Sequence, residues 1–206
     1  MKYLFLLLLS TCLTAQITVN RTWYFAQTAG GASGLSVTDN FNRADEALDA
    51  SANWTSDYGT TSAALSIVSN VVKCDNASLA NSMYWSADAF ADAQYAQTVV
   101  NGDGNDGGAS VRGGSGDNYM VNNYGGSITI LQFNANSYDT IASQSGDYDG
   151  SSTYKITANG TALATFENGS ATGMPSGTDA SLTSGSAGIF SYGTTLTHDD
   201  WAGGDL

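Results

Sequence analysis

Acidic side chains have the most obvious chemical use in this chain, because paired carboxyl groups can hydrolyse glycosidic bonds. Such groups must lie roughly 5–9.5 Å apart. The only glutamates are Glu46 and Glu167, and neither has another acid two to five residues away on a predicted strand. Asp147 and Asp149 are two residues apart, but they lie in a turn rich in glycine and serine. The sequence therefore argues against paired-acid catalysis.

Nucleophilic catalysis finds no better support. The single histidine, His198, precedes two aspartates, and no serine lies in a Gly-x-Ser-x-Gly motif. We interpret His198 as a surface or structural residue. Cys74 lies in a predicted strand and is expected to be a small core residue rather than a reactive thiol. One histidine without a cysteine partner also excludes a transition-metal catalytic site.

A loop rich in glycine and aspartate lies at residues 101–108 and contains a formal Gly-x-Gly-x-x-Gly pattern. A dinucleotide site needs that pattern to open a helix, whereas here a strand is predicted to follow, and two aspartates would repel phosphate. The same acids, Asp103 and Asp106, suit calcium. The alternative is a plain hairpin loop, in which these residue types are common. Asp199 and Asp200 form a second candidate calcium pair.

Carbohydrate recognition needs aromatic faces for sugar rings and amide groups for hydroxyls. The chain supplies both beside predicted turns. The candidate ligand-binding residues are Trp54, Tyr58, Tyr119, Asn122, Asn123, Tyr124 and Tyr138. Core packing is the alternative role for each of these aromatic residues.

The charge balance restricts the class of partner. Of 206 residues, 6 are Lys or Arg and 19 are Asp or Glu, which gives a formal net charge of −13. Nucleic acid is excluded as a partner, because phosphate binding needs a basic surface. Charged residues are only 12% of the chain, so its surface must be covered mainly by small and neutral polar residues.

The first residues differ in composition from the rest. Residues 1–15 combine a lysine, a short apolar run and small residues, which predicts a signal peptide or an apolar anchor. The run is too short for a stable membrane span, which takes about 20 apolar residues. Residues 16–37 resemble an arm or linker, and residues 38–206 are predicted to form one domain. Removal of residues 1–15 would leave one cysteine and no intramolecular disulfide.

The rest of the chain has the pattern of an all-β protein, with short runs rich in Val, Ile, Thr, Tyr and Phe between turn residues. The clearest hairpin spans residues 154–166, where Asn159-Gly160 predicts a type I′ turn that pairs Ile156 with Leu163. Two more hairpins are expected at residues 118–133, turning at Gly125-Gly126, and at residues 65–74, turning near Asn70. Other strands are predicted at 94–100, 109–112, 138–143, 187–191 and 195–201. Ten or more such strands imply a two-sheet sandwich.

Several short motifs carry a resemblance to a known family. They are Asp39-Asn40-Phe41-Asn42-Arg43 with Asn53-Trp54 near the start, Tyr84-Trp85, Gln94-Tyr95-Ala96-Gln97 and Val111-Arg112 in the middle, and Asp199-Asp200-Trp201 at the end. In this order they resemble the concanavalin A-like lectin/glucanase domains of secreted bacterial and phage virion proteins. The resemblance implies an antiparallel jelly roll whose first and last strands lie side by side. It also implies that Phe41 and Trp201 meet in the core.

The resemblance says less about activity, since this sandwich carries enzymes, lectins and inert modules. The enzyme branch places its acids on one strand as Glu-x-Asp-x-x-Glu, a pattern missing here. We therefore expect a non-catalytic module, secreted or displayed on a virion, that binds glycans or cell-surface polysaccharide. The alternative is a structural assembly subunit, such as a filament or capsid-decoration protein, that uses its N-terminal segment to contact other copies or virion proteins. A diverged glycosidase comes third.

Overall fold

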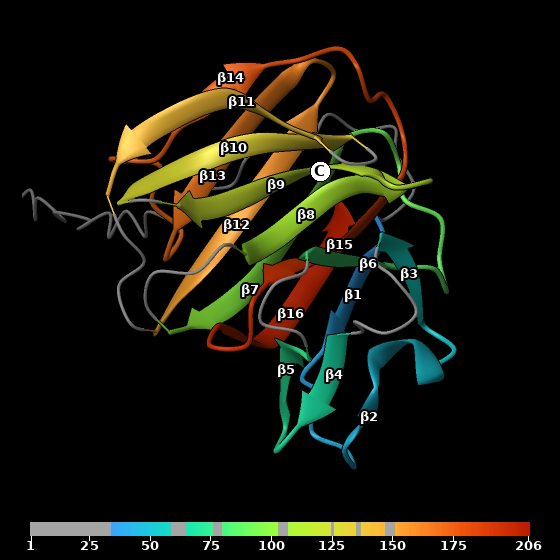
Figure 1. Cartoon of the computed structure of the whole chain (residues 1–206). Coiled ribbons are helices and arrows are strands. Elements are labelled where there is room, and N and C mark those ends of the chain that lie inside the picture. Colours follow the sequence, from blue (N-terminus) through green and yellow to red (C-terminus); the bar gives the residue numbers. More distant parts are fainter. Residues whose placement is uncertain are drawn as a thin grey trace, which may run out of the picture. The chain divides into compact units, whose positions relative to one another are not determined.

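The computed structural model describes residues 34–58, 65–75, 80–102, 107–124, 126–134, 137–146 and 151–206. This part of the chain contains sixteen strands, one short 3-10 helix, η1 (Leu48–Ala50), and no α-helix. The predicted segment 1–15 and residues 16–33 of the predicted arm 16–37 lie outside the described residues. The end of that arm belongs to the domain, because Ser36 and Val37 pair with the last strand. All strand pairs are antiparallel and they form two sheets (Figure 1).

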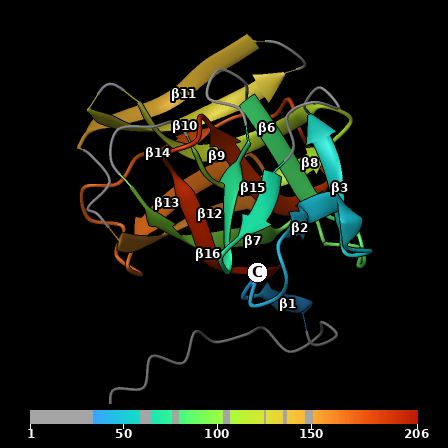
Figure 2. The same ribbon diagram turned by 60° about the horizontal axis from the view of Figure 1, so that its bottom comes forward.

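The larger sheet has nine strands. In spatial order, eight of them are β14 (Ser176–Thr178), β13 (Ala162–Glu167), β12 (Ser151–Asn159), β7 (Gln94–Asn101), β16 (Thr197–Asp205), β5 (Val71–Cys74), β4 (Leu65–Val68) and β2 (Glu46–Ala47). The ninth, β1 (Ser36–Asp39), pairs with β16. The first and last strands therefore lie side by side, as the resemblance implied, and Figure 2 shows β1 beside the C-terminal end.

The smaller sheet has seven strands. Their spatial order is β11 (Ser137–Ser145), β10 (Ser127–Asn134), β9 (Asp117–Tyr124), β8 (Gly107–Gly114), β15 (Ser186–Tyr192), β6 (Ala80–Trp85) and β3 (Trp54–Tyr58). The two sheets pack face to face. Strand β7 shows the sandwich pattern plainly, because its residues alternate between buried and partly exposed.

Three tryptophans fill the space between the sheets. The ring centroid of Trp54 lies 4.7 Å from that of Trp201, and the rings of Trp85 and Trp201 stack at 5.5 Å. Phe41 packs 6.2 Å from Trp54 and is fully buried, as Trp201 nearly is. The placement of Phe41 and Trp201 in one core is confirmed. Each large aromatic side chain buried here contributes roughly 1.5–3 kcal/mol relative to exposure.

Two of the three predicted hairpins form with the expected turns. Strands β9 and β10 pair Tyr124 with Ser127, and strands β4 and β5 pair Val68 with Val71. The turn between β4 and β5 has positive φ angles at both of its central residues, 55° and 67°, as a type I′ turn requires.

The predicted register of the third hairpin is wrong by two residues. Ile156 pairs with Thr165 rather than Leu163, and the turn consists of Gly160 and Thr161. Only Gly160 of this turn has positive φ, at 57°, which is the type II′ pattern with glycine first. A shift of two residues leaves every side chain on its predicted face, so the alternation of buried residues could not reveal the error.

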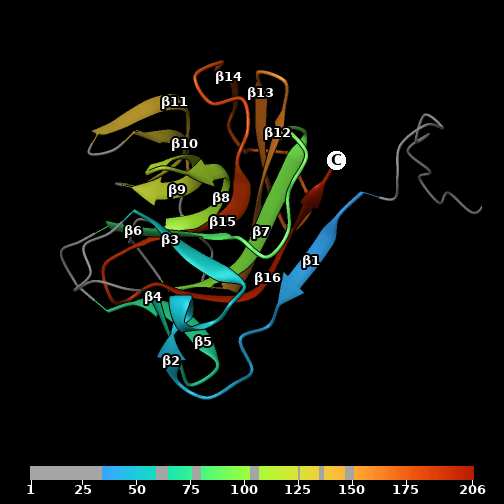
Figure 3. The ribbon, with the colours of Figure 1, turned by 90° about the vertical axis from the view of Figure 1, so that its right-hand side faces the viewer.

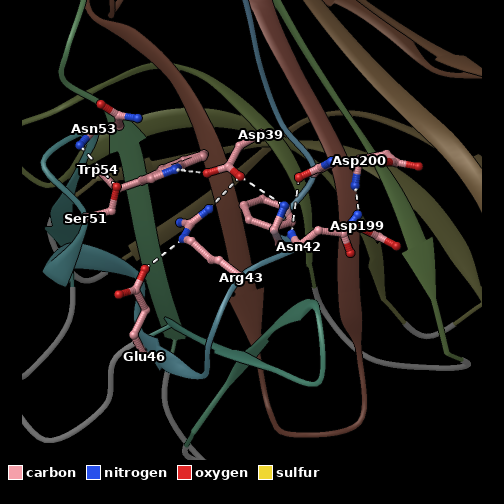
Figure 4. Close-up of polar contacts among 11 residues, drawn as sticks. Asp39, Asn42, Arg43, Glu46, Ser51, Asn53, Trp54, Asp199 and Asp200 are labelled. Atoms are coloured by element: carbon pink, nitrogen blue, oxygen red, sulfur yellow. Dashed lines mark hydrogen bonds and ion pairs between the residues drawn. The ribbon is translucent and has the colours of Figure 1, made fainter.

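A partly buried carboxylate connects the first strand to the smaller sheet. Asp39 accepts hydrogen bonds from Trp54 Nε1 (2.9 Å), Arg43 Nη1 (2.7 Å) and the backbone N–H of Phe41 (2.9 Å). Arg43 also donates to Glu46 at 2.7 Å (Figure 4). These contacts fix the Trp54 ring within the core, so the first motif of the resemblance has a structural role.

A buried arginine joins three loops at one end of the sandwich. The Arg112 guanidinium donates to the backbone carbonyls of Leu182 (2.6 Å), Gly160 (2.7 Å) and Asp92 (3.0 Å). Its backbone N–H donates to Gln94 Oε1 at 3.0 Å. Arg112 has a positive φ of 56°, a conformation that costs a non-glycine residue energy. The hydrogen bonds offset that cost.

His198 lies in the core. It pairs across the sheet with Val72 and Val100, and its side chain is fully buried. Neither ring nitrogen has a hydrogen-bond partner among the described residues. Burial lowers the pKa of His198 to about 3. Of the two roles that the sequence left open, the structure gives it the structural one.

Replacement of His198 by leucine is expected to make the free energy of unfolding less dependent on pH between about 3 and 6.5. The unfolded histidine gains its proton near pH 6.5, whereas the folded one stays neutral down to about pH 3. Titration of this group therefore leaves folding stability unchanged above about pH 6.5 and lowers it as the pH decreases toward 3, by up to about 1.4 kcal/mol per pH unit. Urea unfolding of wild type and His198→Leu at pH 8, 6 and 4 measures the difference. Parallel pH profiles would contradict the prediction.

Replacement of Asp39 by asparagine should lower the free energy of unfolding by about 1–3 kcal/mol, because one amide oxygen cannot accept all three hydrogen bonds. The matched control is Asp49→Asn, since Asp49 is exposed and its replacement changes the net charge equally. Thermal and urea unfolding of both variants make the comparison. An equal change in the two variants would assign the effect to net charge.

Candidate functional site

The outer face of the smaller sheet carries an apolar cluster separate from the core. Along β9, Tyr119 and Val121 point between the sheets, so Met120 points outward. Met120, Leu131, Phe133 and Phe190 form this second cluster, and all four are largely buried. Such burial on an outer face means that the side chains cover one another within a concave surface.

Contacts across the sheet demonstrate its curvature. Tyr138 on β11 and Phe190 on β15 are four strands apart, a distance of about 19 Å in a flat sheet. Their ring centroids lie only 6.1 Å apart, at a steep angle. Phe133 packs against both rings, with its centroid 4.9 Å from that of Tyr138 and 6.3 Å from that of Phe190. The sheet therefore curls so that this face is concave, and Figure 3 views both sheets near their edges.

The curvature creates a hollow of about 440 Å³, within the range of ligand-binding pockets. We call it the concave hollow. It is lined by Asn122, Thr129, Leu131, Tyr138, Thr140, Phe190 and Tyr192. The lining combines aromatic rings, an amide and hydroxyl groups, and it includes no charged side chain.

The structure brings two of the seven predicted ligand-binding residues to the concave hollow. Asn122 is buried at its base, and Tyr138 lies at its rim with 45% of its surface exposed. Trp54 and Tyr119 lie in the core, where they take the packing role that the sequence left as the alternative. Asn123 is buried opposite the core residue Ile128. The side chains of Tyr58 and Tyr124 lie outside the described residues.

Tyr119 anchors the loop before β15. Its hydroxyl donates to Asp179 Oδ1 at 2.5 Å and accepts from the backbone N–H of Leu182 at 2.9 Å. Burial, together with the bond to Asp179, raises the pKa of Tyr119 to about 12. Desolvation acts to raise the pKa of Asp179, but hydrogen bonds from Tyr119 and Ser181 outweigh it and lower that pKa. This pairing is structural.

Sequence reasoning did not single out Asp57, the acid that reaches the outer face of the smaller sheet. Its Oδ1 accepts from the backbone N–H of Gly116 at 2.9 Å. Its Oδ2 lies 3.3 Å from both Ser82 Oγ and Asn118 Nδ2, and Ser82 pairs directly with Phe190. Burial raises the pKa of Asp57. The carboxylate thus ties the edge strand β3 to the turn between β8 and β9.

The concave hollow also contains residues that the sequence search overlooked. Leu131, Phe190 and Tyr192 lie in strands whose apolar positions suggested only core packing. A period of two separates the faces of a strand, but it does not say which face is concave. Curvature depends on how several strands pair, and this information is spread over the whole chain.

The candidate calcium pair at Asp199 and Asp200 forms a bulge in β16. The pairing with β7 shifts between Asp199 and Ala202, and Asp200 has a positive φ of 45°. Asp199 Oδ1 accepts the backbone N–H of Asp200 at 2.8 Å (Figure 4). Calcium needs six to eight oxygen ligands. Within the described ranges no three acidic, histidine or cysteine residues gather in a cluster that could hold a metal ion. Asp103 and Asp106 lie outside the described residues.

Comparisons based on sequence find no relative. No protein-family model matches the chain, and a search of the curated proteins finds no match. Among the residues that the structure describes, no helix is long and apolar enough to cross a membrane. The remaining comparison with known proteins rests on the arrangement of the strands.

Several solved structures share that arrangement. The carbohydrate-binding module CBM66 from Bacillus subtilis aligns with 72% of this chain and 93% of its own, at 16% identity and a TM-score of 0.56. The VIP36 exoplasmic/lumenal domain, bound to Ca²⁺ and Man2, covers 83% and 87%, at 12% identity and a TM-score of 0.56. A β-glucanase from Bacillus licheniformis covers 85% and 100%, at 11% identity and a TM-score of 0.53. The described domain therefore has the concanavalin A-like jelly-roll fold that its motifs resemble.

Proposed function

We propose that this domain is a non-catalytic carbohydrate-binding module and that its ligand lies in the concave hollow. The observation that carries the proposal is the lining itself, in which tyrosine rings stand beside an amide and two threonine hydroxyls. The fold alone does not decide, because the β-glucanase has the same fold. Support comes also from two structures of the same fold, because CBM66 is a carbohydrate-binding module and the VIP36 domain is bound to Man2.

The lining of the hollow offers both kinds of contact that a sugar needs, apolar and polar. Sugar rings present C–H faces that pack on aromatic rings, and their edges carry hydroxyl groups that need hydrogen-bond partners. Tyr138 and Tyr192 supply rings at the hollow, and Asn122, Thr129 and Thr140 supply polar groups. Tyr138 is also held against Phe133 and Phe190, so little conformational freedom is lost when a ligand packs on it.

The proposal of binding without catalysis follows from the distribution of acids. No carboxylate lines the concave hollow. Asp57 reaches the same face of the sheet, but its oxygens are engaged by Gly116, Ser82 and Asn118. Paired-acid hydrolysis requires two carboxyl groups on either side of the scissile bond. Asp57 is therefore the residue to replace in any test for hydrolysis.

We further propose that the chain is exported, through the segment at residues 1–15, and meets glycans or cell-surface polysaccharide outside the cell or on a virion surface. Self-association or binding to virion proteins is the competing proposal, in which residues 1–37 act as an interaction arm. An intact mass that retains residues 1–15, combined with a blank glycan array, would favour assembly over carbohydrate binding.

Replacement of Tyr138 by alanine is expected to weaken carbohydrate binding at least tenfold, because burying an aromatic side chain against a ligand is worth roughly 1.5–3 kcal/mol. A glycan array selects the ligand, and calorimetry compares the variants. Tyr95→Ala is the matched control, since Tyr95 is a partly buried tyrosine on the outer face of the other sheet. Equal losses in both variants, or no loss in Tyr138→Ala, would contradict the site.

Incubation with a polysaccharide panel should release no reducing sugar above a blank. Wild type and Asp57→Asn are expected to give the same result, because we assign Asp57 to holding the strand edge. Release by wild type that disappears in Asp57→Asn would replace the binding module by a glycosidase.

Calcium is proposed only for the loop that contains Asp103 and Asp106. If the ion binds there, a chelator should lower the melting temperature of wild type but leave that of the Asp103→Asn, Asp106→Asn double variant unchanged. The Asp199→Asn variant should respond to chelation as wild type does, because its carboxylate is already bound to the backbone. A melting temperature of wild type that does not respond removes calcium from the proposal.

A further inference from the structure

The basic residues of the described chain are all placed away from the concave hollow. Arg43 is paired with Asp39 and Glu46, and the Arg112 guanidinium is held by three backbone carbonyls. The two lysines lie on the larger sheet. None of the four lines the hollow.

The lysines are also poorly placed to reach a ligand on the smaller sheet. Lys155 lies on β12, where its Nζ stands 4.4 Å from the centroid of the Tyr95 ring. Lys73 lies on β5 and pairs with Ser66 and Thr197 of the neighbouring strands. Since Tyr95 faces outward from the larger sheet, both the ring and Lys155 are on the far side of the sandwich from the hollow.

One acidic side chain, by contrast, lies on the same outer face of the smaller sheet as the hollow. This is Asp57, which contacts Ser82, the partner of Phe190. Asp139 is exposed on β11, but it alternates with Tyr138 and Thr140 and therefore points to the opposite face of that strand. The chain as a whole carries a formal charge of −13. The negative net charge and the Asp57 carboxylate both disfavour the approach of an anion, and no cation lines the hollow to offset them.

Resting on the proposed function, we infer that the concave hollow selects uncharged polysaccharides and rejects anionic ones, such as uronic-acid or sulfated chains. Binding a carboxylate or sulfate usually relies on a charge-assisted hydrogen bond from Arg or Lys. The hollow offers neutral donors and acceptors only, so an anionic sugar would lose its hydration without gaining a cationic partner. Specificity then depends on the cost of binding an anionic sugar as much as on the favourable contacts with a neutral one.

The test uses polysaccharides in pairs that share a backbone and differ in charge. Dextran is compared with dextran sulfate, cellulose with carboxymethyl cellulose, and methyl-esterified homogalacturonan with its de-esterified form. The expected result is binding to neutral members, with the anionic member of any bound pair at least tenfold weaker. Binding to the neutral member should change little between 50 and 500 mM NaCl, because no ion pair is involved.

A positive charge added to the hollow provides a second test of the inference. Thr140→Lys places a cation at an exposed position of the lining, and the matched control Thr172→Lys adds the same charge in an exposed loop outside both sheets. Thr140→Lys should gain binding to the anionic members at low salt, whereas Thr172→Lys should not. A gain that is equal in both variants would assign the effect to net charge and overturn the inference.

The outcomes separate the inference from the function on which it rests. If wild type binds an anionic member as tightly as its neutral counterpart, the inference is wrong and the binding module stands. If wild type binds none of the six polysaccharides and nothing on a glycan array, the proposed function fails and the inference fails with it.

Discussion

The packing of three tryptophans between two sheets is the constraint on which the rest of the structure depends. Trp54 comes from the edge strand of the smaller sheet, and Trp201 comes from the last strand of the larger one. Their contact at 4.7 Å joins the sheets, and Asp39 holds the Trp54 ring through its indole N–H. Because inward positions are thus filled, the alternating outward positions of the smaller sheet are left to form a second surface.

That second surface owes its shape to curvature rather than to a loop. Phe190 and Tyr138 meet although three strands lie between theirs, which requires the sheet to curl. On β8, one of those three strands, Gly107 allows close packing, since a Cβ there would clash with the side chain of the core residue Leu196. A hollow built on paired strands is more rigid than one built on loops. The lining is therefore largely formed before any ligand arrives, which lowers the entropy cost of binding.

The sequence predicted the fold better than the site, and the reason lies in which residues carry the family motifs. Asp39, Arg43 and Trp54 form one hydrogen-bonded cluster, and Gln94 and Arg112 belong to another. Both clusters hold strands and loops in place. Motifs of this kind indicate an architecture, and they carry no information about the hollow on the opposite face of the smaller sheet, where we propose that a ligand binds.

Local sequence patterns also explain which turns of the structure were predictable. The β4–β5 turn was predictable because Asn70, a residue type that tolerates positive φ, lies between two short apolar runs. The turn after β12 was not, because Asn159-Gly160 and Gly160-Thr161 both satisfy a two-residue turn. In the structure, Arg112 binds the carbonyl of Gly160 and Asp179 binds that of Thr161. These partners lie far away in sequence, so tertiary contacts selected the register.

Charged residues are few in this chain, and their positions explain a physical property of the hollow. Arg43 and Arg112 are used to hold the chain together, and Lys155 packs against aromatic rings on the larger sheet. A cation in the concave hollow would have needed a partner, because an unpaired charge among Phe190, Leu131 and Tyr138 loses hydration. Neutral hydroxyls and an amide avoid that cost and still offer directional hydrogen bonds. The composition that argues against nucleic acid as a partner thus also bears on the class of sugar that we propose for the hollow.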